Sequence, residues 1–326
     1  MRIIVMKFGG SSLAEPEKIK VMAERAVKIR AAGYAVVMTV SAPADITDDL
    51  ITLSKLLTLK PEPREYDALL STGENLSASL MAMAIRGRNV KAVSLSGAQT
   101  GIRTTLRHGD ADIISINPAR ILRELKKNKI VVVAGFQGVN KAEDIATLGR
   151  GGSDLTAVTL THALRAGMCE LYTDVKGIYT ANPAVVPQAK KIKRISYTAL
   201  MALARSGTEV RQLRAIAYAK KHRIPLHLRS SFENTEGTMV GDFKSAGIKP
   251  EVTCFSIQKL GDSAWIHIIG SKLDALRIKE TVRETSAANG CLLMKETYTP
   301  KKISLSTAFR DGERLLKALH KIFIQK

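Results

Sequence analysis

The chain has 326 residues, with 50 Lys and Arg against 30 Asp and Glu, so its formal net charge is +20. This length exceeds what one hydrophobic core usually supports and predicts two domains, and no apolar run approaches the ~20 residues that a membrane span needs. The charge attracts polyanions, but the basic residues are scattered and aromatic residues make up only 5%, so we do not expect a nucleic-acid-binding protein.

Apolar runs rich in β-branched residues alternate with segments of helical periodicity over the first 240 residues. The predicted strands are, in chain order, 3–6, 35–40, 90–95, 130–134, 170–173 and 225–228. The first predicted helix starts at Pro16 and is ended by Gly33. The other predicted helices are 47–57, 74–85, 118–127 and 154–166, with two more between 173 and 225. Continuous apolar strands separated by helices predict a three-layer α/β/α sandwich with a mostly parallel sheet.

The remainder of the chain predicts a smaller α+β unit. A Gly-, Lys- and Pro-containing stretch over 237–250 is typical of a linker. After it we expect a strand at 264–269, a helix at 273–284, strands at 292–296 and 303–307, and a helix at 312–322. The predicted domains are therefore 1–243 and 251–326.

The N-terminal residues and the cysteines indicate the cellular compartment of the protein. The run Met1–Met6 is too short for the apolar part of a signal peptide and leads directly into a glycine turn. Cys169, Cys254 and Cys291 are far apart and match no metal or disulfide spacing. We expect a cytoplasmic protein without a resident metal site.

Ligands of a parallel sheet bind at the carboxyl ends of its strands, and the first glycine turn falls there. It reads Lys7-Phe8-Gly9-Gly10-Ser11. Two glycines let backbone amides approach a phosphate, and the lysine adds a positive charge. The order of residues excludes a Walker A loop and a Rossmann fingerprint.

A second turn, Gly149-Arg150-Gly151-Gly152-Ser153-Asp154, stands before a predicted helix. Its amides suit an anion, its arginine suits a carboxylate, and its aspartate could order the lysine and a metal. The alternative is a helix N-cap by Ser153 between flexible glycines. A third turn, Thr173-Asp174 through Tyr179, could hold a nucleotide base or ribose, or could be an ordinary turn.

Six motifs now occur together in order: KFGGSS, STGENLSA, VAGFQGV, TLGRGGSD, YTDVKGIYT and LRSS. Across almost all of residues 1–240 the chain resembles the aspartate kinases, a branch of the amino-acid kinase family. The resemblance implies phosphorylation of the side-chain carboxylate of L-aspartate, with ATP and Mg²⁺ as cofactors, as the first step toward lysine, threonine and methionine.

The resemblance also implies a role for each motif residue. Lys7 would neutralise the transferring phosphoryl group and Asp154 would align that lysine, while Gly9, Gly10 and Ser11 would hold phosphate. On the substrate side it implies Ser41, Thr47, Glu74, Arg150, Gly152 and Ser153. On the nucleotide side it implies Thr173, Asp174 and Tyr179. Without the resemblance, Glu74 could be a first-turn acid that favours a helix dipole, and Ser41 and Thr47 could cap the helix near residue 47.

The chain departs from that family in several places. Pro43 stands in the loop after Ser41, Ala184 replaces an arginine, and Glu209 replaces a lysine expected near the nucleotide. Residues 251–326 resemble one ACT regulatory domain, whereas aspartate kinases typically carry two. The turn at 270–274 lacks the Pro-Gly that receives an inhibitor, so we expect feedback control by lysine or threonine to be absent or altered. ACT-like units commonly pair, which implies a homodimer.

The sequence leaves three alternatives to an active aspartate kinase. The departures fit a relative that phosphorylates another acidic amino acid in a specialised pathway. They also fit a non-catalytic subunit that binds an amino acid or nucleotide. Charge alone would fit a polyanion-binding protein.

Overall fold

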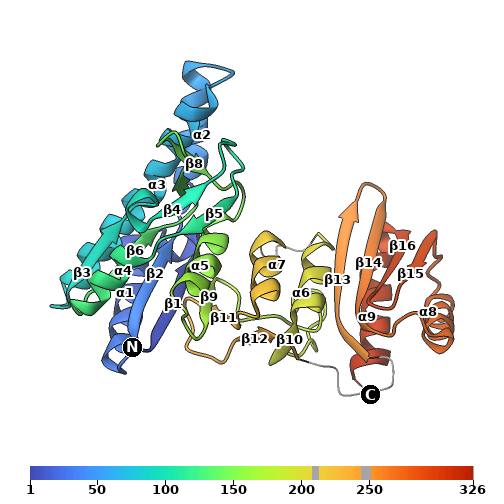
Figure 1. The fold of residues 1–326 in the computed structure, drawn as a ribbon. Helices are drawn as coiled ribbons and strands as arrows, with labels where there is room; N and C mark the ends of the chain where they lie inside the picture. The colour runs from blue at the N-terminus through green and yellow to red at the C-terminus, as the bar shows by residue number, and fades with distance from the viewer. Residues whose placement is uncertain (208–212, 244–250, 326) are drawn as a thin grey trace. The chain divides into compact units, whose positions relative to one another are not determined.

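The computed structural model describes residues 1–207, 213–243 and 251–325 (Figure 1). The chain divides into two compact units, one of residues 1–176 and 218–237, the other of residues 177–217 and 238–326. The predicted domain division between 243 and 251 stays a prediction. Most of the predicted linker, residues 244–250, lies outside the described residues.

Six strands of the first unit lie side by side in the order β11-β9-β1-β2-β6-β3, and every neighbouring pair is parallel. Their bounds are β1 (Ile3–Phe8), β2 (Ala35–Val40), β3 (Ala92–Leu95), β6 (Ile130–Ala134), β9 (Cys169–Thr173) and β11 (Leu226–Ser230). The predicted α/β class with a mostly parallel sheet is confirmed.

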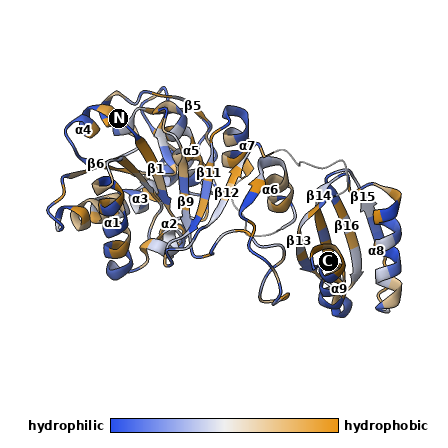
Figure 2. Ribbon diagram, turned by 90° about the horizontal axis from the view of Figure 1, so that it is seen from below, coloured by the Kyte–Doolittle hydropathy of each residue, from blue (hydrophilic) through white to orange (hydrophobic). Residues whose placement is uncertain are grey.

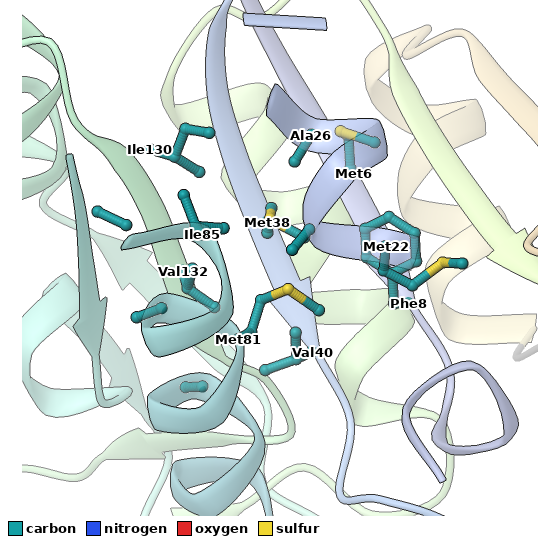
Figure 3. Packing of buried hydrophobic residues seen from close by; sticks show 14 of the residues in the cluster. Met6, Phe8, Met22, Ala26, Met38, Val40, Met81, Ile85, Ile130 and Val132 are labelled. Carbon is teal, nitrogen blue, oxygen red and sulfur yellow. The ribbon is translucent and has the colours of Figure 1, made fainter. Parts of the chain in front are cut away.

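Helices cover both faces of this sheet. α1 (Pro16–Ala31) and α3 (Pro63–Arg86) bury Met22 and Met81 against alternate residues of β1, β2 and β6, such as Met6 (Figure 3). Successive strand residues point to opposite faces. Lys7 is therefore directed to the other face, where α5 (Gly152–Ala163) contacts β1.

The first unit also has a side sheet that the sequence did not predict, in the order β5-β4-β7-β8. Its bounds are β4 (Ile102–Thr104), β5 (Ile113–Ile116), β7 (Gln137–Val139) and β8 (Ile145–Thr147). Strands of three or four residues are too short to show a clear alternation of apolar and polar residues. The remaining elements are η1 (Gly10–Leu13), α2 (Ile46–Leu57), η2 (Ala98–Thr100) and α4 (Ala119–Lys126).

One helix boundary corrects the sequence analysis. α3 begins at Pro63 rather than at Glu74. Proline is favoured in the first turn of a helix because its missing N–H would have no partner there. The Glu62 side chain also accepts a hydrogen bond from the backbone N–H of Glu65, which caps this end.

The second unit holds an antiparallel sheet in the order β13-β14-β16-β15. β13 (Glu251–Leu260) was not predicted, because a bulge between Val252 and Cys254 breaks its alternation. The other bounds are β14 (Ser263–Ser271), β15 (Lys295–Tyr298), β16 (Lys302–Ala308), η3 (Phe309–Asp311), α8 (Leu276–Ala288) and α9 (Gly312–Ile324).

The two helices beside this small sheet, α8 and α9, are amphipathic. They bury Val282 and Leu315 in one core with Ile266 of β14. Much of the α8 ribbon is blue in Figure 2, which marks hydrophilic residues. The same unit contains a parallel pair, β10 (Arg194–Ser196) and β12 (Thr238–Gly241), and α6 (Tyr197–Ala204). α7 (Leu213–His222) begins in this unit and ends in the first. Among the described residues, none of the helices combines the length and the apolar character that crossing a bilayer demands.

Candidate active site

A cavity of about 370 Å³ lies in the first unit and brings together all six predicted substrate-side residues and Lys7. Those that line it are Lys7, Ser41, Thr47, Glu74, Arg150, Gly152 and Ser153. They come from β1, the loop after β2, α2, α3 and the start of α5. These segments are far apart in the chain and meet because a parallel sheet places its strand ends along one edge.

Lys7 supplies the cation at the base of the cavity. It is only 8% exposed, and its Nζ atom lies 2.8 Å from a carboxylate oxygen of Asp154 on α5. A Cβ atom added to Gly9 would lie 3.6 Å from the same Nζ atom, so the glycine turn passes next to the ammonium. Lys7 and Asp154 therefore form an ion pair, and the catalytic alignment of the lysine stays a prediction.

Glu74 is a buried acid in the middle of a helix. It is 4% exposed, and its Oε1 atom accepts a hydrogen bond from the backbone N–H of Ala42 at 3.0 Å. Its Oε2 atom has no hydrogen-bond partner among the described residues. Burial raises the pKa of Glu74 to about 7, although the Ala42 N–H and the Lys7 ammonium act in the opposite direction. The alternative of a first-turn acid is wrong, because α3 starts eleven residues earlier, at Pro63.

Arg150 is held on a tight turn between two glycines. Gly149 and Gly151 have φ angles of +72° and +63°, in the left-handed region that glycine adopts without steric cost. The Arg150 side chain is exposed at the mouth of the cavity. Gly151 is the N-cap residue of α5 and Ser153 lies inside the helix, so the alternative of a Ser153 cap is wrong.

Ser41 and Thr47 line the same cavity. The alternative that they cap α2 is not supported, because its N-cap residue is Asp45 and no side chain caps this end. Both side chains are half-buried and face a cavity whose charged residues have opposite signs. They are therefore placed to contact a small polar ligand.

The predicted nucleotide-side residues do not line this cavity. Gly10 and Ser11 form the start of η1 after β1. Thr173 ends the neighbouring strand β9, and its hydroxyl donates to the Asp174 carboxylate at 2.8 Å. Tyr179 belongs to the second unit and forms an isolated bridge with Lys191.

Two residues, Ala184 and Glu209, differ from the family where it has a cation expected near the nucleotide. Ala184 is exposed in the second unit. Glu209 lies outside the described residues.

Seven lining residues escaped the sequence analysis: Tyr66, Leu70, Phe136, Thr147, Asp48, Ile51 and Gly109. The first two would follow from the true start of α3, because they lie one or two turns before Glu74 on the same helix. Phe136 has a φ angle of +67°, and its N–H donates to the Thr156 hydroxyl at 3.2 Å. Its place inside the VAGFQGV motif was the available signal.

No cluster of three or more potential metal-ligating side chains occurs within residues 1–207, 213–243 and 251–325. Asp48 and Glu74 are the carboxylates that line the cavity, and Asp154 next to it is paired with Lys7. The donor set therefore fits a ligand with an ammonium and carboxylates better than a protein-bound cation.

A sequence model of the amino acid kinase family matches residues 2–230. Among curated proteins, the aspartokinase of Mycolicibacterium smegmatis is 46% identical over 241 residues, which are 74% of this chain and 57% of that protein. The aspartokinase of Geobacillus stearothermophilus is 49% identical over 240 residues, with coverages of 74% and 59%. The chain thus spans less than two thirds of the length of these relatives.

Solved structures show a similar fold. A structure of E. coli aspartokinase III in complex with aspartate and ADP superposes with a TM-score of 0.82 over 100% of both chains, at 20% identity. The aspartate kinase of Synechocystis gives a TM-score of 0.68 at 27% identity, over 98% of this chain and 69% of that one.

Proposed function

This chain belongs to the amino acid kinase family, and from that premise we propose that it transfers the γ-phosphoryl group of ATP to the side-chain carboxylate of L-aspartate. The supporting observation is a cavity in which one buried cation, one buried acid and one exposed arginine surround a space of amino-acid size. The similarity to aspartokinases in sequence and fold supports the same substrate.

The cavity provides complementary charges for aspartate. The Oε2 atom of Glu74, which has no partner among the described residues, would accept from the substrate ammonium. Arg150 would hold a carboxylate through two parallel N–H bonds. Ser41 and Thr47 would contact the amino acid from the third side. Together these contacts fix the orientation of the reacting carboxylate, which removes much of the entropic barrier.

The transfer itself needs no general base. The side-chain carboxylate of aspartate has a reference pKa of about 4 and is already ionised at neutral pH. One of its oxygens forms a bond to the γ-phosphorus, the bond from that phosphorus to the bridging oxygen breaks, and ADP leaves with the electron pair. The products are aspartyl phosphate and ADP.

The main obstacle is that one anion must approach another. Lys7 would neutralise the transferring group, because its ammonium reaches the edge of the sheet beside the glycine turn. Asp154 keeps this ammonium in place at 2.8 Å. Backbone amides of Gly9, Gly10 and Ser11 would contact phosphate oxygens, and Thr173 and Asp174 of the same unit would lie on the nucleotide side. Mg²⁺ would enter as part of the MgATP substrate and would offset part of the charge on its phosphates.

We also propose a cytoplasmic homodimer that acts in lysine, threonine and methionine synthesis. Three free and buried cysteines, Cys169, Cys254 and Cys291, fit a reducing compartment. The edge strands β13 and β15 of the small sheet could pair with a second copy. Mass photometry on the purified protein tests the dimer, and a single peak near 35 kDa would contradict it.

A hydroxylamine trap tests the reaction. Purified protein is incubated with MgATP, hydroxylamine and one of a panel of acidic amino acids, and the hydroxamate is measured. Hydroxamate formed from L-aspartate supports the proposal. Hydroxamate formed only from another amino acid would show that this amino acid, and not L-aspartate, is the substrate. If the protein binds aspartate and ATP but forms no hydroxamate, it is a non-catalytic binding protein and not a kinase.

A further inference from the structure

We propose that Asp67 is a positioning residue for the amino-acid substrate, because its buried carboxylate fixes the Arg150 turn relative to Glu74. This inference rests on the proposed function and assigns a role that no motif of the sequence revealed. Asp67 does not line the substrate cavity itself, so it acts through the residues that it holds.

Asp67 is a fully buried acid on α3 that gathers two other segments. Its oxygens accept from the backbone N–H of Gly109 at 3.1 and 3.0 Å. They also accept from the backbone N–H of Thr147 at 3.0 Å and from its hydroxyl at 2.5 Å. One side chain therefore joins α3, the turn at 108–109 and the end of β8.

His108 completes this cluster from the outer side. Its Nδ1 atom lies 2.8 Å from the Oδ2 atom of Asp67, and its side chain is 17% exposed. It borders a second cavity of about 330 Å³, which shares Tyr66 and Gly109 with the substrate cavity. His108 is thus part of the wall between two cavities.

The residues that Asp67 holds are neighbours of the substrate groups. Glu74 follows Asp67 by seven residues, which is two turns along the same face of α3. Thr147 precedes Arg150 by three residues at the end of β8. Gly109 and Thr147 line the substrate cavity directly. The carboxylate therefore sets the distance between the group that binds the ammonium and the group that binds a carboxylate.

The cluster requires a carboxylate rather than an amide. Two backbone N–H groups and one hydroxyl donate to Asp67, and an ionised carboxylate accepts at both oxygens. An asparagine would place its NH₂ group against at least one of these donors. The substitution Asp67→Asn keeps the size of the side chain but releases Thr147 or Gly109, so the Arg150 turn loses one of its anchors.

The test compares Asp67→Asn with the wild type and with the control Glu124→Gln. Glu124, on α4, is also a buried carboxylate of the first unit. It is paired with Lys129 and does not line the substrate cavity. The KM for aspartate, the KM for ATP and kcat are measured by hydroxamate formation, and thermal unfolding is followed by circular dichroism. We expect Asp67→Asn to raise the KM for aspartate about tenfold, as for a lost hydrogen bond to a charged group, with the KM for ATP unchanged.

A second pair of variants covers the case in which Asp67→Asn does not fold. His108→Ala removes one contact at a partly exposed position, and His108→Asn restores a side-chain nitrogen near the place of Nδ1. We expect the first to raise the KM for aspartate and the second to return it toward the wild-type value.

The outcomes separate this inference from the proposed function. If the wild type forms no hydroxamate, the proposed function fails and this inference fails with it. If the wild type is active while folded Asp67→Asn or His108→Ala keeps its KM for aspartate, this inference alone is overturned. A fall in kcat with both KM values unchanged would likewise show a purely structural role.

Discussion

The Lys7 ammonium and the Asp154 carboxylate lie 2.8 Å apart, with side-chain exposures of 10% and 7%. Removal of one partner from a buried ion pair leaves an uncompensated charge and costs about 3–5 kcal/mol, whereas replacement of both partners is often neutral. The proposed chemistry uses the same ammonium. Stability and catalysis therefore respond differently to changes in this pair.

We predict that Lys7→Met lowers the free energy of unfolding by about 3 kcal/mol, because the buried Asp154 carboxylate loses its ammonium partner. The double variant Lys7→Met/Asp154→Asn should recover most of this stability. Its turnover should stay about 10³-fold below that of the wild type, because the group that neutralises the phosphoryl charge is missing. Urea unfolding and the hydroxamate assay measure the two effects. A double variant that regains activity would show that Lys7 only holds Asp154.

Glu74 predicts how substrate binding depends on pH. Its pKa is raised to about 7, chiefly by burial. Only the ionised form makes an ion pair with the substrate ammonium, so the KM for aspartate should be about tenfold higher at pH 6 than at pH 8. The side-chain carboxylate of aspartate stays ionised over this range. Glu74→Gln should have a high KM that does not vary with pH. A wild-type KM that is flat from pH 6 to 8 contradicts this role.

The same acid should destabilise the protein without ligand. The native state binds the Glu74 proton more tightly than the unfolded state, because the pKa is about 7 in the fold against a usual 4.5. Its contribution to stability is therefore lost as pH rises from about 4.5 to 7. We expect Glu74→Gln to be more stable than the wild type at pH 8 by up to roughly 3 kcal/mol, with no difference near pH 4.5. Urea unfolding at the two pH values measures this difference, and equal stability at pH 8 contradicts it.

Arg150 should act on binding and not on folding. Its side chain is exposed and lies between two glycines. Arg150→Ala should raise the KM for aspartate about 100-fold, since a bidentate charged contact is lost, while the unfolding free energy stays within about 0.5 kcal/mol. Arg150→Lys keeps the charge but not the fork, and should recover only part of the affinity. A variant with unchanged KM would remove Arg150 from the substrate site.

The sequence was sufficient for the layers of the first unit because its strands are long apolar runs. The runs from Ile130 to Ala134 and from Ala35 to Val40 are continuous, and both became central strands. It was not sufficient for the side sheet, whose strands are only three or four residues long. β13 was also missed, because its bulge separates the core residues Val252 and Phe255 by three positions instead of two.

Some residues of the candidate site could likewise be predicted from the sequence and others could not. Residues with an unusual local pattern, such as Lys7 beside two glycines and Arg150 between two, could be selected from the sequence. Asp67 could not, because its importance depends on Gly109 and Thr147, which come from distant segments. Its local sequence is that of an ordinary helix residue. Contacts of this kind follow from tertiary structure alone.

The turn after β14 predicts the response to end-product amino acids. Leu273, in this turn, is fully buried in the core of the small sheet, and its N–H donates to the Pro300 carbonyl at 3.0 Å. The N–H of Gly270 donates to the Lys301 carbonyl at 3.1 Å. Backbone groups that an effector could use at these two positions are therefore already bonded within the fold.

We expect lysine and threonine at sub-millimolar concentrations to leave the rate of hydroxamate formation and the melting temperature unchanged. An allosteric effector typically changes affinity by about 5–150-fold, so an effect of that size would be clear in an aspartate titration with and without each amino acid. Lys272 has a φ angle of +54° in this turn. Lys272→Gly relaxes that backbone without adding an effector contact, and serves as the control for nonspecific loosening. Inhibition of the wild type by either amino acid, lost in a turn variant that still folds, would show that this turn is a working effector site.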